Sequence, residues 1–300
     1  MDRIAIIEHI RDNDKLLSIP QVLSQVLEEV GKEDFSPDSL GKIILKDPNL
    51  TGRLLRLVNS SFYQRMAEIT TVNQAVSVLG VTTVKCMALS TSIFHPEKIA
   101  KESGVEPRSF FAYELAIAAA AEKIAEAVGY HSREEAFIAG LLQDIGILYF
   151  LHHYPAQYHK VLNRKHKKCS LVEAECEVFD IDHAEVGHYL AETWKLPEYI
   201  ARVIRGHHVS DETAEKDILC NIVRLAVLLT NDHFSGYDLS IERRLDAIHR
   251  MSDVLGIPKE RVDEISSSLL SATRTTAEFL GIDIGDTEEI LGKANQEIWK

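Results

Sequence analysis

The strongest constraint on the fold is the spacing of the apolar residues, which recur three and four positions apart in several separate stretches. This spacing puts apolar side chains on one face of an α-helix and is typical of helices that pack against a core. It is clearest in three sets: Val22, Val26 and Val30; Leu50, Leu54, Leu57 and Val58; and Ala136, Ile138, Leu141, Leu142 and Ile145. No alternation of apolar and polar residues reaches the length of a β-strand. The sequence therefore predicts an all-α fold.

Residues that begin helices recur between these stretches. Ser36 and Asp47 each precede a proline, which suits the first helical position because its missing N–H is not needed there. Elsewhere a capping box is predicted, in which two side chains three residues apart bind each other's backbone N–H groups. The boxes are Thr71 with Gln74, Ser132 with Glu135, Ser170 with Glu173, Asp182 with Glu185, and Asp286 with Glu289. Each box predicts a helix boundary.

The chain has 300 residues, close to the length of about 250 to 300 residues at which a single hydrophobic core stops growing. We expect an N-terminal helical lobe over residues 1–105, which ends in the polar stretch HPEKIAKESGVEP. A second helical lobe is expected over 106–232. C-terminal helices follow over 233–300, entered through NDHFSGYDLS, whose glycine and polar residues predict a loop.

The net charge and the cysteines indicate which partners and which cellular location to expect. A formal net charge of −13 indicates a surface that repels phosphate backbones, so nucleic acid is not expected as a partner. The basic run NRKHKK at 163–168 is interpreted as a solvated helix end. The four cysteines form no CxxC pair, and we recognise neither a signal peptide nor an apolar run of about 18 residues. We expect a cytoplasmic protein that does not bind membranes.

The stretch AFIAGLLQDIGIL at residues 136–148 contains the pair Gln143-Asp144. A histidine before the aspartate would let an imidazole and a carboxylate bind one metal ion. Gln143 offers a neutral and weakly basic amide oxygen instead. Two glycines of the same stretch, Gly140 and Gly146, are interpreted as allowing close helix packing and as ending a helix, respectively.

Several stretches in consistent order carry a family resemblance. They are SIPQVLSQVLEEV, KDPNLTGRLLRLVNSSFY, ITTVNQAVSVLGVTTVKCMAL, AFIAGLLQDIG, HAEVGHYLAETWKLPEYI and RGHH. Over roughly residues 15–210 the chain resembles the HD-related output domain (HDOD) family of bacterial signalling proteins. The resemblance implies a multi-helix fold, a role in signal transduction and a relationship to HD-superfamily metal-dependent phosphohydrolases.

The resemblance also implies where metal ligands would stand in an active relative. The first histidine would fall near Tyr113, with Glu114 beside it but turned about 100° around the helix. The His-Asp pair becomes Gln143-Asp144, and the last aspartate would fall near Val227. A protonated phenol, an amide and an isopropyl group are poor ligands or none. A degenerate site of this kind is not expected to hydrolyse phosphate esters.

The resemblance implies a remaining set of potential ligands, because metal-rich HD relatives carry histidines in comparable places: Asp144, His183, His207 and His208. Together they suit a single divalent transition metal, such as zinc, iron or nickel, better than magnesium. The alternative is structural: His183 follows the N-cap Asp182 in the first turn of a helix, while His207 and His208 end a helix and contact its carbonyls.

From these observations we expect a non-catalytic regulatory output module that acts through signalling protein partners. No cofactor is required by this hypothesis, and a homodimer is compatible with it because symmetric dimers are common. Two alternatives stay open, a residual metal-dependent phosphohydrolase and a sensor that binds a metal or a nucleotide in the HD-like pocket.

Overall fold

The computed structural model describes residues 2–12, 21–30, 36–59, 68–93, 99, 101–165, 169–208, 216–230, 241–280 and 282–286. Every regular element within these ranges is a helix, which confirms the predicted all-α fold. The stretch NDHFSGYDLS, Glu289 and the end of the NRKHKK run lie outside the described residues.

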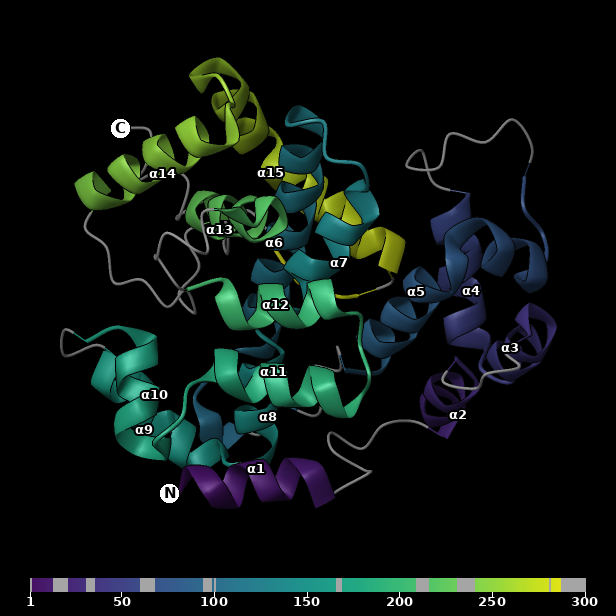
Figure 1. Cartoon of the computed structure of the whole chain (residues 1–300), viewed down its shortest axis with the longest axis horizontal. Coiled ribbons are helices and arrows are strands. Elements are labelled where there is room, and N and C mark those ends of the chain that lie inside the picture. The colour runs from purple at the N-terminus through teal and green to yellow at the C-terminus, as the bar shows by residue number, and fades with distance from the viewer. Residues whose placement is uncertain are drawn as a thin grey trace.

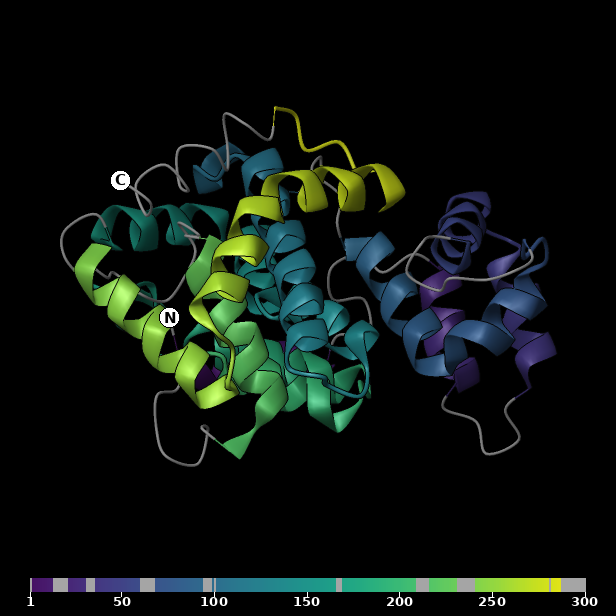
Figure 2. The ribbon, with the colours of Figure 1, turned by 90° about the horizontal axis from the view of Figure 1, so that it is seen from above.

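One group of helices stands to one side of the rest of the molecule (Figure 1), and Figure 2 shows the same separation from above. It contains α2 (Gln21–Val30), α3 (Pro37–Ile44), α4 (Pro48–Val58) and α5 (Val72–Ile93). Helix α5 bends at Gly80, whose φ of 75° lies in the left-handed region that favours glycine. The group joins the body where α5 contacts α7 (Arg133–Leu142) and α4 contacts α15 (Lys259–Leu280).

Helix α6 (Pro107–Ala127) runs through the middle of the body, packed against α7, α13 (Ile218–Thr230) and α15. Helix α14 (Ile241–Leu255) in turn packs against α13 (Figure 1). A 3₁₀ turn, η2 (Lys101–Ser103), precedes α6. The close approach of α6 and α7 depends on a small residue, because a Cβ on Gly140 would lie 3.2 Å from Ala118 Cα. This agrees with the packing role predicted for Gly140.

The remaining helices form a layer beside α6 and α7. They are α8 (Ile145–His153), α9 (Pro155–Lys165), α10 (Leu171–Phe179), α11 (His183–Thr193) and α12 (Glu198–Gly206). Helix α11 packs against both α8 and α12, and α10 packs against α9. Helix α11 is therefore the central helix of this layer, and its first residue is His183.

Helix α1 (Arg3–Asp12) packs against α11 rather than against α2–α5 (Figure 1). Arg3 pairs with Glu185, and the guanidinium of Arg11 lies 5.6 Å from the centre of the Tyr189 ring. His9 Nδ1 lies 2.7 Å from the Tyr149 hydroxyl of α8. The first helix of the expected N-terminal lobe therefore contacts the second lobe, and the division at residues 105 and 232 stays a prediction.

Several predicted helix starts coincide with observed caps. The complete capping box forms at Ser170 and Glu173, and the side chains of Ser132 and Asp182 each accept a bond from the backbone N–H three residues on. Thr71 accepts from Gln74 N at 3.3 Å. Ser36 caps α3 without a side-chain hydrogen bond. At these positions the predicted helix starts agree with the observed ones.

One apolar stretch was missed in the sequence. Residues Arg133–His153 are long and apolar enough to cross a membrane by length and composition, but 89% of the apolar window is buried inside the fold. The stretch comprises α7, the Gln143-Asp144 turn and α8, so it forms part of the core. Its burial accounts for its composition.

Candidate functional site

The candidate site is centred on the turn between α7 and α8. Asp144 occupies the N-cap position of α8 with φ −100° and ψ 24°, but its side chain makes no capping hydrogen bond. The carboxylate is therefore available for other partners. Asp144 and Gln143 are each only 1% exposed, and burying a charge of this kind requires a compensating partner.

A contact between two glycines brings Asp144 close to α11. Gly146 lies in the first turn of α8, where a Cβ would come within 2.0 Å of the His183 carbonyl oxygen. Gly187 lies on the facing side of α11, where a Cβ would lie 2.6 Å from Ile204 Cγ2 and 3.3 Å from Gly146 N. The prediction that Gly146 ends a helix is wrong: its missing side chain lets α8 and α11 meet backbone to backbone.

His183 begins α11 and is fully buried. Its Nδ1 lies 2.6 Å from Glu175 Oε2, which also accepts the His183 backbone N–H at 2.9 Å. Glu175 is buried too, and its other oxygen accepts the Tyr158 hydroxyl at 2.9 Å. On the opposite side of the ring, His183 Nε2 lies 3.3 Å from Asp144 Oδ1. His183 therefore sits between two buried carboxylates.

His207 and His208 follow the end of α12. His207 Nδ1 lies 2.7 Å from the Ile204 carbonyl oxygen, and His207 Nε2 lies 3.1 Å from Asp144 Oδ1. His208 Nε2 lies 2.6 Å from His183 Nε2. The end of α12 is held by the buried guanidinium of Arg224, which donates to the Gly206 carbonyl from Nε at 3.1 Å.

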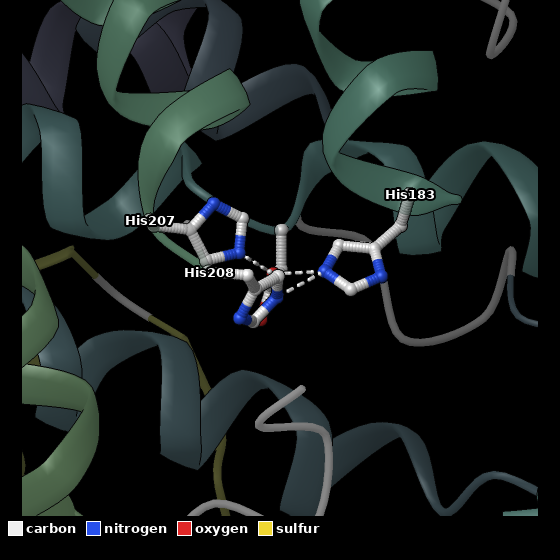
Figure 3. Close-up of side chains that lie close together, drawn as sticks. His183, His207 and His208 are labelled. Atoms are coloured by element: carbon white, nitrogen blue, oxygen red, sulfur yellow. Dashed lines mark hydrogen bonds and ion pairs between the residues drawn. The ribbon is translucent and has the colours of Figure 1, made fainter. Parts of the chain in front are cut away.

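The four side chains thus meet at one point, as Figure 3 shows for the three labelled histidines. One donor atom from each of Asp144, His183, His207 and His208 lies within 4.8 Å of the others. Carboxylate and carbonyl oxygens can only accept hydrogen bonds, so Nδ1 is the donor in both His183 and His207. This leaves the Nε2 atoms of both rings facing Asp144.

The charges in the group stabilise one another. Burial alone would raise the pKa of Asp144, but hydrogen bonds and charge interactions with His183 and His207 hold that pKa well below its usual range. Burial alone would lower the pKa of His183, but Glu175 and Asp144 raise it well above its usual value. Burial, reinforced by His207 and His183, lowers the pKa of His208 well below its usual value. We infer that His183 carries the positive charge and donates from Nε2 to a neutral His208.

The donor set fits a transition metal ion. Three imidazoles and one carboxylate match the ligand types of tetrahedral zinc sites, and iron or nickel would also accept them. Histidines that bind metals commonly donate their other N–H to a carboxylate or a backbone carbonyl, which fixes the ring and increases its basicity. Glu175 does this for His183, and the Ile204 carbonyl does it for His207. Metal binding at this set stays a prediction.

The other predicted positions, Tyr113, Glu114 and Val227, lie on α6 and α13. Glu114 lines the space beside Asp144 together with Phe110, Leu141, Leu142, Ile145 and Leu148. Tyr113 is not among the described residues that line that space, so of these two neighbours on α6 it is Glu114 that lies on the side of Asp144. Val227 is buried on α13 and contributes an apolar side chain. Among the described residues, none of Tyr113, Glu114 and Val227 joins the four converging donors.

Sequence reasoning missed Glu175. The residue occupies the apolar face of α10, four positions from Leu171 and four from Phe179, and all three are fully buried. A carboxylate inside an apolar stripe is a signal of a buried partner. His183 is that partner.

Comparison with known proteins places this geometry in a family. A sequence model of the HDOD domain matches residues 16–210. The chain belongs to the HDOD domain family. The HDOD match contains all of the converging donors and both glycines of the α8–α11 contact.

Solved structures share the HDOD fold at low sequence identity. An HDOD domain protein of unknown function from Geobacter sulfurreducens is 23% identical with a TM-score of 0.63, covering 92% of this chain and 98% of that one. A candidate phosphohydrolase from Shewanella amazonensis is 22% identical with a TM-score of 0.65 and the same coverage. A candidate signal transduction protein from Marinobacter aquaeolei is 20% identical with a TM-score of 0.61, covering 93% of this chain and 64% of that one.

A relative in Treponema pallidum (strain Nichols), an uncharacterized protein, is 25% identical over 200 residues. The match covers 65% of this HDOD chain and 38% of the relative. The matched region therefore spans well under half of the length of that relative.

Proposed function

We propose that this protein is a non-catalytic signalling module that acts by contacting other proteins. The observation that supports the proposal is the closure of the site, where four side-chain donors converge and three of them are fully buried. Zinc sites with four protein ligands are generally structural, whereas catalytic zinc sites keep one position open for water or substrate. A donor set without an open position favours a structural role for the site over a catalytic one.

The surroundings of the donors support the same proposal. The space beside Asp144 that Glu114 and its apolar neighbours line leaves no room for a water molecule. Gln143 and Val227 stand where the resemblance predicts metal ligands, and an amide or an isopropyl group does not replace an imidazole or a carboxylate. A phosphate ester would need both an open metal position and space next to it.

Signalling is suggested by the family and by the candidate signal transduction protein of Marinobacter aquaeolei, which shares the fold. We place the partner-binding surface on the exposed parts of α2–α5, which stand to one side of the rest of the molecule (Figure 1), and of α14–α15. The acidic net charge of −13 argues against nucleic acid as the partner.

A homodimer is the simplest partner arrangement to test, because two-fold dimers are the commonest soluble oligomers. Light scattering at high micromolar concentration is expected to give twice the mass of the chain. A strictly monomeric particle would exclude self-association and leave a different protein as the partner.

The catalytic alternative is tested by phosphate release. The purified protein, supplied with manganese, iron or zinc, is incubated with a panel of nucleoside mono-, di- and triphosphates. We expect no release that distinguishes the wild type from Asp144→Ala, or from the control Asp246→Ala at an exposed position on α14. Release that is lost in Asp144→Ala and kept in Asp246→Ala would overturn the non-catalytic proposal in favour of a residual phosphohydrolase.

A second candidate function, a metal-responsive module, is favoured by the hydrogen bonds that fix the histidine rings. Asp144, His183 and His207 would hold an ion with His208, and the ion would link α8, α11 and the end of α12. Metal analysis of freshly purified protein tests this candidate. A bound transition metal near one equivalent supports it, and a trace amount together with no affinity for added zinc would remove it.

A further inference from the structure

Gln143 makes one hydrogen bond in the site, and it makes it to Asp144. Its Nε2 lies 2.9 Å from Asp144 Oδ2, and the side chain is 1% exposed. A carboxylate oxygen only accepts hydrogen bonds, so the amide nitrogen must be the atom that faces it. The other amide atom, Oε1, is buried and has no hydrogen-bond partner within the described residues.

The two oxygens of Asp144 therefore have different neighbours. Oδ1 faces the imidazoles, 3.3 Å from His183 Nε2 and 3.1 Å from His207 Nε2, whereas Oδ2 faces the amide of Gln143. The amide N–H stands at Oδ2, where a cation would otherwise approach. Only Oδ1 remains available to an ion held by the histidines.

We propose that Gln143 is a positioning residue that keeps Asp144 a one-oxygen ligand and so limits the centre to a single four-coordinate ion. This inference rests on the metal-responsive candidate function above. A leucine would fill the same space without leaving a buried oxygen unpaired, which costs stability. The contribution of the amide therefore comes from its nitrogen.

A histidine at position 143 would change the number of ions that the centre can hold. An imidazole in place of the amide would release Oδ2 and add a nitrogen donor beside it. Glu114 lines the space next to Asp144, and a second ion there would have to displace the side chains that fill this space. By binding Asp144 Oδ2, Gln143 prevents this oxygen and the Glu114 carboxylate from forming a second ion site.

The test uses the 300-residue chain, freed of metal and then loaded with Co²⁺ alone. Equilibrium dialysis gives the bound cobalt per chain and its affinity, and visible absorption reports coordination because four-coordinate Co²⁺ absorbs more strongly than five-coordinate Co²⁺. The proteins compared are wild type, Gln143→Leu, Gln143→His and the control Gln74→Leu, at an exposed position on α5. Gln143→Met, a side chain of similar length without an N–H, replaces Gln143→Leu if the latter does not fold.

We expect one four-coordinate cobalt per chain in the wild type and in Gln74→Leu. In Gln143→Leu the absorption weakens as Oδ2 joins the ion, and the affinity falls by about 10- to 100-fold, as when other groups that orient ligands are removed. Gln143→His is expected to bind more than one cobalt per chain.

Two outcomes contradict the inference in different ways. A wild-type spectrum and affinity in Gln143→Leu or Gln143→Met, even with a lower melting temperature, would show that Gln143 acts only in packing and would overturn this inference alone. A wild type that binds no cobalt would overturn both the inference and the metal-responsive function.

Discussion

Glu175 Oε2 accepts two hydrogen bonds from His183, one from Nδ1 at 2.6 Å and one from the backbone N–H at 2.9 Å. The pair joins α10 to the start of α11, and both residues are fully buried. His183 is thereby held in the one orientation in which Nε2 faces Asp144. The position of the histidine depends on a carboxylate that is not itself one of the converging donors.

Replacing Glu175 by glutamine is expected to lower the free energy of unfolding by about 3 to 5 kcal/mol, because it leaves a buried imidazolium without its main partner. Urea denaturation of the metal-free protein measures the change. Glu177→Gln on the same helix is the control, since Glu177 pairs with Arg164 at the surface and should contribute about 0 to 1 kcal/mol. Equal effects of the two substitutions would contradict the assignment.

Replacing Gly146 by alanine is expected to cost about 1 to 3 kcal/mol, since its Cβ would come within 2.0 Å of the His183 carbonyl oxygen. The strain separates α8 from α11, so metal affinity should fall as well. In contrast, Gly52→Ala on α4 puts a Cβ 3.5 Å from Arg56 Nη1, an ordinary contact, and should stabilise the helix by about 1 kcal/mol. Thermal unfolding of both variants checks the difference in sign.

Stability is expected to fall as the pH is lowered from about 6.5 to about 4, in part because of His153. Burial, with the neighbouring His152 and His9, lowers the pKa of His153 to about 4. The unfolded chain therefore binds this proton first, and the stabilisation present above pH 6.5 is lost on acidification. His153 Nε2 has no hydrogen-bond partner among the described residues, so His153→Phe removes no bond to it.

The melting temperature of His153→Phe should therefore decrease less steeply than that of the wild type over this pH range. His249→Phe, at an exposed position on α14, is the control and should keep the wild-type slope. Parallel curves for His153→Phe and wild type would show that His153 is not responsible.

Zinc is expected to stabilise the wild type if the four donors bind it. At a free concentration about 100 times the dissociation constant, the free energy of unfolding should rise by about 2.7 kcal/mol and return to its original value on chelation. Asp144→Asn should abolish the rise, whereas Asp246→Asn at an exposed position should keep it. A rise that survives Asp144→Asn would locate the zinc elsewhere.

Features encoded by neighbouring residues could be predicted from the sequence. The caps at Ser170 and Asp182 depend on residues within one turn, and the helical periodicity is equally local. The converging donors were reached through the family resemblance, because Asp144 lies far from His183 and His207 along the chain. No local sequence pattern predicts that the side chains of Asp144, His183 and His207 lie close together.

Features that depend on packing between distant helices were missed or wrong. Gly146 was interpreted from its own stretch as a helix end, but the facing Gly187 on α11 determines its role. The rotation of α6 likewise decides that Glu114, rather than Tyr113, lines the space beside Asp144. Register between packed helices is a tertiary property, which helical spacing alone does not fix.

Because α1 packs against α11, we expect a fragment that folds independently to include α1. The HDOD match starts at residue 16, after α1 has ended, yet Ile6 and Ile10 of α1 are fully buried. A fragment trimmed to the matched range would uncover their neighbours, including the outer side of the helix that begins with His183. The range that the HDOD model matches is thus smaller than the set of helices that packs around the donors.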